Sequence, residues 1–269
     1  MNKKKRRGVK MQGIDHRAED YKYLSQIMVV GENSPSPRLP LHSFLAPSRP
    51  TYLTREEILT RRVYSYLDGR RWGYARKERE QLLHLALRKG ASPVPVFLLE
   101  GFSDIFEGKT ERARNAYQRA IKEPSSTAYT LDIYILREFI SYMSPPDSEE
   151  IGGESSEQDA TEIPWFFSPV ANALYRSKTN PQSLAINELG QIADALISEP
   201  GTKRFVALIL RGIQGKRLLE RGEYAWAERV LTYTAERAEK LMNFNSALNA
   251  AVLHDLQTAQ QGVAHLSYQ

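Results

Sequence analysis

One stretch, residues 101–124, limits what this chain can fold into more than any other. Its second half places apolar side chains at helical spacing on one narrow face: Ala113, Ala116, Tyr117, Ala120 and Ile121. Three of these five residues are alanines, so a partner helix can approach closely. Gly108 precedes this helix, and apolar residues before that glycine predict another helix. The stretch therefore predicts a tight helical hairpin that ends at Pro124.

The same pattern recurs near the other end of the chain. Gly215 and Gly222 repeat the spacing of Gly101 and Gly108. Two later positions also match: Ala227 corresponds to Ala113, and Leu231 corresponds to Tyr117. Thr234 stands where the first copy has an alanine. The copies begin 114 residues apart, which is about three periods of 34 to 40 residues and predicts degenerate repeats between them.

This pattern resembles the tetratricopeptide repeat, in which a small residue, a turn glycine, an alanine, a large apolar residue, an alanine and a proline follow in that order. The resemblance implies helical hairpins stacked into a solenoid. The first helix of each pair would line a concave groove for a protein or peptide. Since no stretch shows convincing strand alternation, we predict an all-α fold. We expect a tetratricopeptide-like α-solenoid in two blocks with an extended N-terminal arm.

Composition divides the chain into four parts. Residues 1–53 form a basic tail and a proline-rich extended arm, with five of the 14 prolines between residues 33 and 51. Residues 54–144 form the first helical-repeat block, which opens with the capping box Thr54-Arg-Glu-Glu57. Residues 145–163 hold seven acidic residues and no basic one, which predicts a disordered linker. Residues 164–269 form the second helical-repeat block.

Basic residues are concentrated early in the chain. Residues 1–100 hold 20 Lys and Arg against 10 Asp and Glu, whereas residues 101–200 hold 8 against 16. The candidate phosphate contacts lie in the tail and in the predicted turn of a helical hairpin at 55–89: Lys3, Lys4, Lys5, Arg6, Arg7, Lys10, Arg70, Arg71, Arg76 and Lys77. The alternative is a solubilising terminus and a turn whose charges are simply solvated.

Aromatic residues are the candidates for docking a partner. Trp72 and Tyr74 interleave with the arginines of the predicted turn, a mixture that suits stacking on bases while phosphates are neutralised. The alternative is that both rings pack inside the turn. Trp165, Phe166 and Phe167 open the second block and should dock on one of the blocks or on a partner.

No catalytic, cofactor-binding or metal-binding residue is predicted. The chain has no cysteine, which excludes disulfides and thiol chemistry and fits a reducing compartment. Its five histidines form no HExxH pair, and neither GxSxG nor GxGxxG occurs. No apolar run approaches the roughly 18–20 residues that span a bilayer, and no signal peptide is evident. We expect a soluble protein of the cytoplasm, or of the nucleus in a eukaryote.

The sequence therefore predicts a non-enzymatic scaffold or adaptor, a subunit of a larger protein assembly. It would bind a protein or peptide through a helical-repeat groove. The alternative is a nucleic-acid-associated or virion structural protein that uses the basic N-terminal arm. Oligomeric state does not follow from these patterns.

The basic tail generates a first prediction. If its six cations contact phosphates on duplex DNA, they give a log–log salt slope of about −5, since each contributes about −0.9. Deleting residues 2–10 should weaken DNA binding in a filter-binding titration and leave the melting temperature nearly unchanged. A full-length protein that binds no nucleic acid even at low salt would contradict the phosphate-binding interpretation of the tail.

Overall fold

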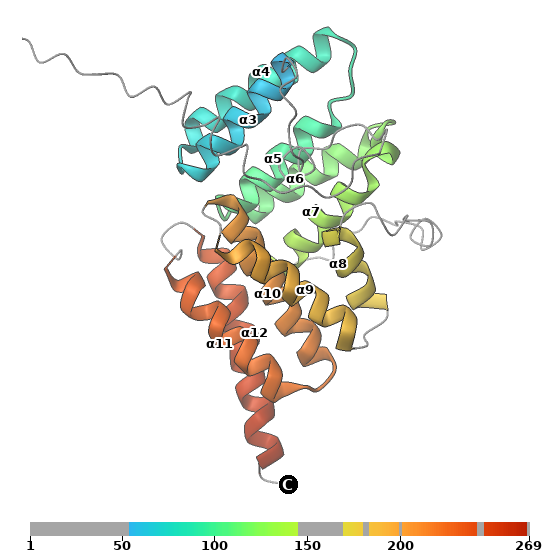
Figure 1. The fold of residues 1–269 in the computed structure, drawn as a ribbon. Helices are drawn as coiled ribbons and strands as arrows, with labels where there is room; N and C mark the ends of the chain where they lie inside the picture. The colour runs from blue at the N-terminus through green and yellow to red at the C-terminus, as the bar shows by residue number, and fades with distance from the viewer. Residues whose placement is uncertain (1–53, 145–168, 180–182, 199–200, 241–244, 268–269) are drawn as a thin grey trace, which may run out of the picture.

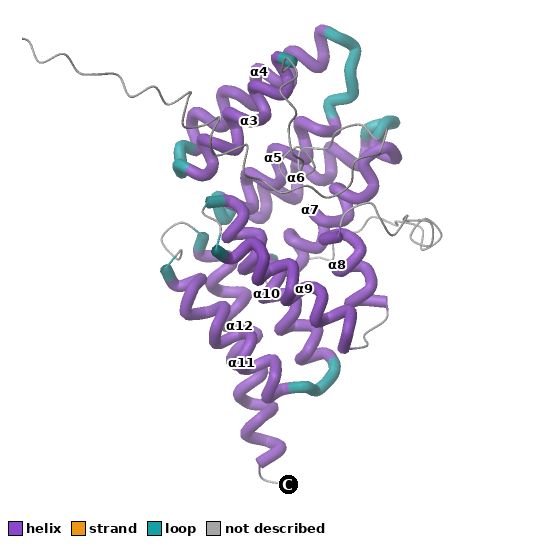
Figure 2. Tube along the Cα trace, in the orientation of Figure 1, coloured by secondary structure: helices purple, strands orange, loops and turns teal. Residues whose placement is uncertain are grey.

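The computed structural model describes residues 54–144, 169–179, 183–198, 201–240 and 245–267 (Figure 1). Every regular element within these ranges is helical, and Figure 2 shows no strand among them. The all-α prediction is confirmed for this part of the chain. The elements are α3 (Arg55–Asp68), α4 (Trp72–Arg88), α5 (Val94–Phe106), α6 (Thr110–Lys122), the 3₁₀ turn η1 (Ser126–Tyr129), α7 (Thr130–Met143), α8 (Pro169–Thr179), α9 (Ser183–Ile197), α10 (Thr202–Glu220), α11 (Tyr224–Glu239) and α12 (Ser246–Ser267).

The first helix begins where its capping box predicts. The Glu57 backbone amide donates to the Thr54 hydroxyl at 3.2 Å, and the Thr54 amide donates to the Glu57 carboxylate at 2.9 Å. Because these two bonds satisfy amides that a helix start leaves without partners, α3 starts at Arg55.

The hairpin of α5 and α6 is confirmed. Ala113, Ala116 and Ala120 are completely buried, and the two helices pack against each other. Gly108 has a φ of +74°, a left-handed conformation that glycine adopts without a side-chain clash. This glycine lets the Lys109 amide reach back to the Asp104 carbonyl at 2.8 Å, which closes the end of α5. The alanine face then meets its partner as the sequence predicts.

The second copy of the pattern is only partly equivalent. Gly222 repeats the left-handed turn, with a φ of +75°. A side chain at Gly215 would collide with Leu231 of the next helix, whereas one at Gly101 would collide with Leu136 of α7. Three described helices, an odd number, separate the two hairpins. In a repeat of helical pairs, an even number of helices would separate two equivalent hairpins. The two copies are therefore not in equivalent positions, and the solenoid stays a prediction.

Two local predictions were wrong or incomplete. The sequence placed residues 70–77 in a turn, but α4 already begins at Trp72. Ala75, Arg79 and Leu82 form its buried face at helical spacing, and this face extends the helix backward. Helix α8 was missed. Its signals were Pro169 at the first helical position and a buried face of small and apolar side chains: Val170, Ala171, Ala173 and Leu174.

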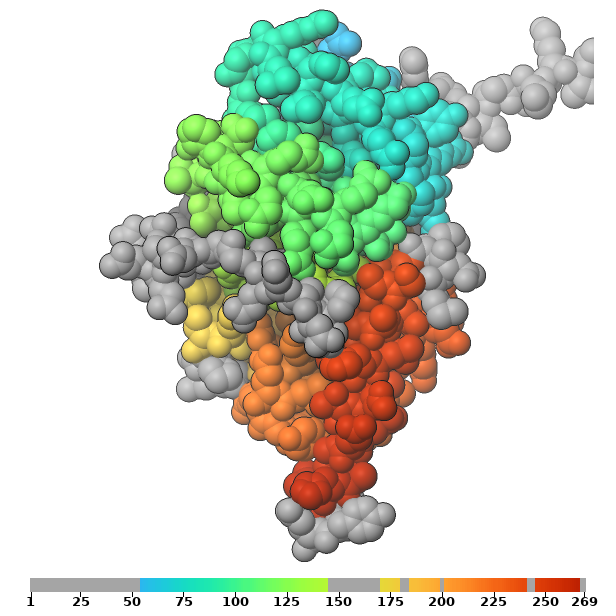
Figure 3. Space-filling view, turned by 180° about the vertical axis from the view of Figure 1, so that it is seen from behind, coloured from blue at the N-terminus to red at the C-terminus, as the bar shows by residue number. Residues whose placement is uncertain are grey.

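Helix α10 lies at the centre of the described structure. It packs on α9, α11 and α12, and it also contacts α7 and α3 from the first predicted block. In the view from behind, the red C-terminal segment lies directly against the green part of the first predicted block (Figure 3), and α12 contacts α7. One continuous cluster of buried apolar side chains runs from α3 to α12. Whether each predicted block folds alone stays a prediction.

Specific polar contacts join the early and late helices. The Thr202 amide at the start of α10 donates to the Asp68 carboxylate at 2.8 Å. The side-chain amide of Asn245 donates to the Ile105 carbonyl at the end of α5, at 2.7 Å. Its side-chain oxygen accepts from the Leu248 amide of α12 at 3.0 Å, so one asparagine caps two helices.

The contact between α7 and α10 depends on a glycine. A side-chain carbon at Gly212 would lie 2.2 Å from the hydroxyl oxygen of Tyr142 and 2.4 Å from its ring. Tyr142 is only 5% exposed, so its ring has little room to move away. Gly212 therefore sets the distance between α7 and α10.

Replacing Gly212 by alanine should overpack this contact. We expect Gly212→Ala to lower the free energy of unfolding by about 1–3 kcal/mol, as measured by urea denaturation. Gly73→Ala is a matched control in α4, because nothing lies within 4 Å of the added carbon. The control should be neutral or stabilising by up to about 1 kcal/mol. Equal stability of the two variants would show that the Gly212 contact is not tight.

Candidate functional site

A shallow, open hollow of about 430 Å³ lies where α3 turns into α4. We call this surface the α3–α4 corner. Its lining residues are Arg70, Arg71, Trp72, Gly73, Tyr74 and Lys77. Five of the six are residues that the sequence analysis proposed for phosphate contact or partner docking. The structure thus brings one group of the predicted candidates together at a single surface.

The turn into the corner has an unusual residue in it. The Arg70 amide donates to the Leu67 carbonyl at 2.9 Å, and the Arg71 amide donates to the Tyr66 carbonyl at 2.7 Å. This pair of bonds is the Schellman motif, which normally places glycine in the left-handed position. Here Arg70 takes that position with a φ of +55°, while Gly69 stands one residue too early. The strain costs roughly 1 kcal/mol relative to glycine.

The two aromatic candidates have different environments. Trp72 is partly buried and packs against the apolar core. Tyr74 is 59% exposed, and its ring lies 5.4 Å from the ring of Tyr66 with a tilt of 32°. The alternative that both rings pack inside the turn therefore holds for Trp72 but not for Tyr74. Sequence reasoning missed Tyr66, since nothing local indicates which ring an antiparallel helix will place beside Tyr74.

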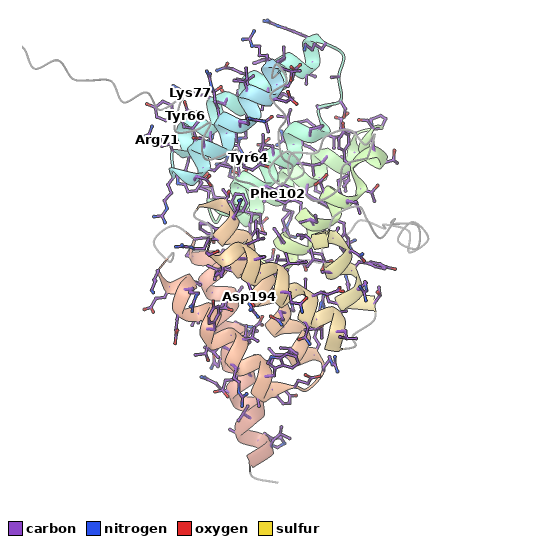
Figure 4. All side chains as sticks on the ribbon, in the orientation of Figure 1. Tyr64, Tyr66, Arg71, Lys77, Phe102 and Asp194 are labelled. Carbon is purple, nitrogen blue, oxygen red and sulfur yellow. The ribbon has the colours of Figure 1, made fainter. Side chains whose placement is uncertain are left out.

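The cations of the corner are also not equivalent. Arg71 and Lys77 are exposed, and their side chains have no hydrogen-bond or ion-pair partner among the residues that the structure describes. Figure 4 shows both at the same end of the hairpin, close to Tyr66. Arg76 instead turns toward Glu107, with 3.9 Å between the charged groups, so it is not part of the hollow.

The local field at the corner is positive. No carboxylate lines the hollow, because the nearby acids are engaged elsewhere. Asp68 accepts from Thr202, and Glu78 lies 3.7 Å from Arg62. The first turn of α4 carries no acidic residue, so the positive end of its helix dipole adds to the field of the arginines. The arrangement can attract and hold an anionic group beside an exposed aromatic ring.

The remaining candidates lie outside the described residues. These are the six cations of the tail, Lys3, Lys4, Lys5, Arg6, Arg7 and Lys10, and the aromatic residues Trp165, Phe166 and Phe167. The structure does not place them, and their roles stay predictions.

Two buried carboxyl groups with raised pKa values lie away from the corner. Burial raises the pKa of Asp132 to about 8, a shift that often marks catalytic carboxyls. Its side chain is only 2% exposed, however, so no substrate reaches it. Burial likewise raises the pKa of Asp104, which is 1% exposed and has Arg112 at 3.3 Å. Both groups act within the protein interior.

Two kinds of feature are absent from the described ranges. No group of three or more His, Cys, Asp and Glu side chains there could hold a metal ion. None of the helices in these ranges combines the length and the apolar character that crossing a membrane requires.

Comparison with protein families, curated proteins and solved structures finds no match to this chain. The resemblance to tetratricopeptide repeats therefore rests on the sequence pattern alone.

Asp132 generates a prediction on stability. Its pKa is raised from an ordinary value near 3.8 to about 8, so the unfolded protein loses this proton at lower pH than the folded protein does. Its contribution to the free energy of unfolding is complete below about pH 4 and is lost as the pH rises through about 8. Asp132→Asn does not titrate.

Urea denaturation of both proteins from pH 4 to 9 measures this contribution. The stability of Asp132→Asn relative to the natural protein should increase up to about pH 8 and then level off. Other groups titrate alike in the two proteins, so their effects cancel in the difference. Parallel stability curves over this range would contradict the raised pKa.

Proposed function

We propose that the protein is a non-enzymatic binding scaffold, a subunit of a larger assembly, that docks an anionic macromolecule on the α3–α4 corner. One observation carries the proposal. The side chains of Arg71 and Lys77 have no partners among the described residues, and they lie beside the exposed ring of Tyr74 in a hollow that no carboxylate lines. Exposed cations next to an exposed aromatic ring are typical of surfaces that recognise a charged partner.

The placement of the hairpin supports a docking role. Helices α3 and α4 lie at one end of the molecule, opposite the C-terminal end of α12 (Figure 1). Asp68 is the last residue of α3, directly before the turn that forms the corner, and it ties the end of α3 to the start of α10. A surface held in this way is presented in a fixed orientation, which lowers the entropy cost of binding.

The groove of a helical repeat is the other surface on which a scaffold of this kind would bind a protein or peptide. That groove needs first helices that stay exposed on one concave face. In the described structure α10 and α12 both pack back onto α7. We therefore base the proposal on the corner, and a groove on another face stays an expectation from the sequence.

Charge reversal at the corner tests the proposal. The full-length protein is titrated against two fluorescent anionic probes, an oligoglutamate and an oligouridylate, at low salt. The double variant Arg71→Glu/Lys77→Glu should bind at least one probe about tenfold or more weakly than the natural protein, because two attractions become repulsions.

The matched control is Arg55→Glu/Arg88→Glu. It makes the same change in net charge at the other end of the same hairpin, on exposed residues outside the hollow. The basic tail is present in all three proteins, so its attraction cancels in the comparison. If neither probe binds, or if both double variants weaken binding equally, the corner is not a docking surface.

A further inference from the structure

We infer that the macromolecule held at the α3–α4 corner is a single-stranded nucleic acid, with a base stacked on Tyr74 and phosphates against Arg71 and Lys77. This inference rests on the proposed docking function and adds the chemical class of the partner. An acidic peptide is the competing partner, because it would also satisfy the two cations.

The aromatic pair favours a base over a carboxylate. Tyr66 backs the Tyr74 ring at a centroid distance of 5.4 Å, and 59% of Tyr74 remains exposed. A ring that is supported on one side and open on the other is a platform for a flat π-surface, which every base has. Aspartate and glutamate side chains have no such surface, so an acidic peptide would leave Tyr74 exposed.

The order of side chains along α4 also matches a nucleotide strand. Arg71 is the N-cap residue of α4, and Tyr74 and Lys77 follow it on the first two turns at intervals of three residues. Tyr74 and Lys77 are neighbours on the helix surface, with a rise of about 4.5 Å between them, and all three residues line the hollow. The chain thus presents a cation, an aromatic ring and a second cation in this order. This order corresponds to the phosphate, base and phosphate of a single strand.

A paired duplex does not fit this surface. Its bases stack on one another inside the helix, so no face is open to Tyr74. The stacking contact therefore selects an unpaired strand, whereas the cations alone would accept both forms.

Arg70 adds a second observation at the rim of the hollow. It holds the left-handed position of the turn although glycine would be free of strain there, and it is the one described residue other than glycine with a positive φ. Backbone strain of this kind concentrates at binding and catalytic sites. We assign Arg70 to a third phosphate contact.

The experiment measures fluorescence anisotropy of a labelled oligouridylate of about 12 nucleotides, within the range that one binding fold covers, against the full-length protein at several salt concentrations. Tyr74→Ala should weaken binding by about 5- to 150-fold, the range for loss of one stacked base, and leave the salt slope unchanged. Tyr74→Phe should restore binding. Leu87→Ala, at another exposed apolar residue of α4, is the matched control and should bind normally.

The cations should give the opposite signature. Arg71→Gln/Lys77→Gln should reduce the log–log salt slope by about 1.4, because each phosphate contact on a single strand contributes about 0.7. Arg70→Gly should raise the melting temperature and reduce the slope by about 0.7. A loss of binding in a protein that has become more stable does not come from unfolding.

The possible outcomes separate the two proposals. Equal binding of oligoglutamate and oligouridylate, with no effect of Tyr74→Ala on either, overturns the inference and leaves the docking function intact. Equal weakening of duplex and single-strand binding by Tyr74→Ala also overturns it. Failure of both probes to bind overturns the inference and the proposed function together. An Arg70→Gly protein with an unchanged slope removes Arg70 from the contacts.

Discussion

The close approach of α7 and α10 at Gly212 is the constraint on which the rest of the structure depends. The ring of Tyr142 occupies the space that a side chain at position 212 would need. Three residues further along α10, Gly215 gives the same room to Leu231 of α11. With two glycines facing different neighbours, α10 can lie close to helices from both predicted blocks. A larger residue at either position would move one neighbour outward.

Polar contacts then fix the orientation that the glycines permit. Glu138 of α7 is only 7% exposed and lies 3.5 Å from Lys178 of α8 and 3.3 Å from Arg217 of α10. A buried ion pair adds little net stability, because its desolvation cost offsets its attraction. A wrong alignment of these helices, however, would leave the carboxylate buried without partners. Together with the Asp68 cap on α10, these contacts determine where the α3–α4 corner points.

Local chemistry explains which parts of the fold could be predicted. The capping box at Thr54, the alanine face of α6 and the turn glycine at position 108 depend on neighbours within a few residues, and all three are confirmed. The missed features depend on partners far away in the chain. Helix α8 is short, and its small buried face has meaning only against the helices that cover it.

The candidate site shows the same division. Composition singled out the arginines and aromatic residues near position 72, because their mixture is visible without a structure. It could not separate Arg76, which turns to a glutamate of α5, from Lys77, which stays in the hollow. It also could not place Tyr66 beside Tyr74 or find the strain at Arg70. These facts arise from the antiparallel pairing of α3 with α4 and from the single turn between them.

Chemical-shift mapping is the most direct test of the claim that the corner is the binding surface. Backbone amide shifts of the ¹⁵N-labelled full-length protein are followed while the oligouridylate is added. The account predicts that the largest changes among residues 54–267 fall on residues 66–77, including the amides of Trp72 and Gly73 at the start of α4. Largest changes on α9, α11 or α12, with the corner unaffected, would contradict it.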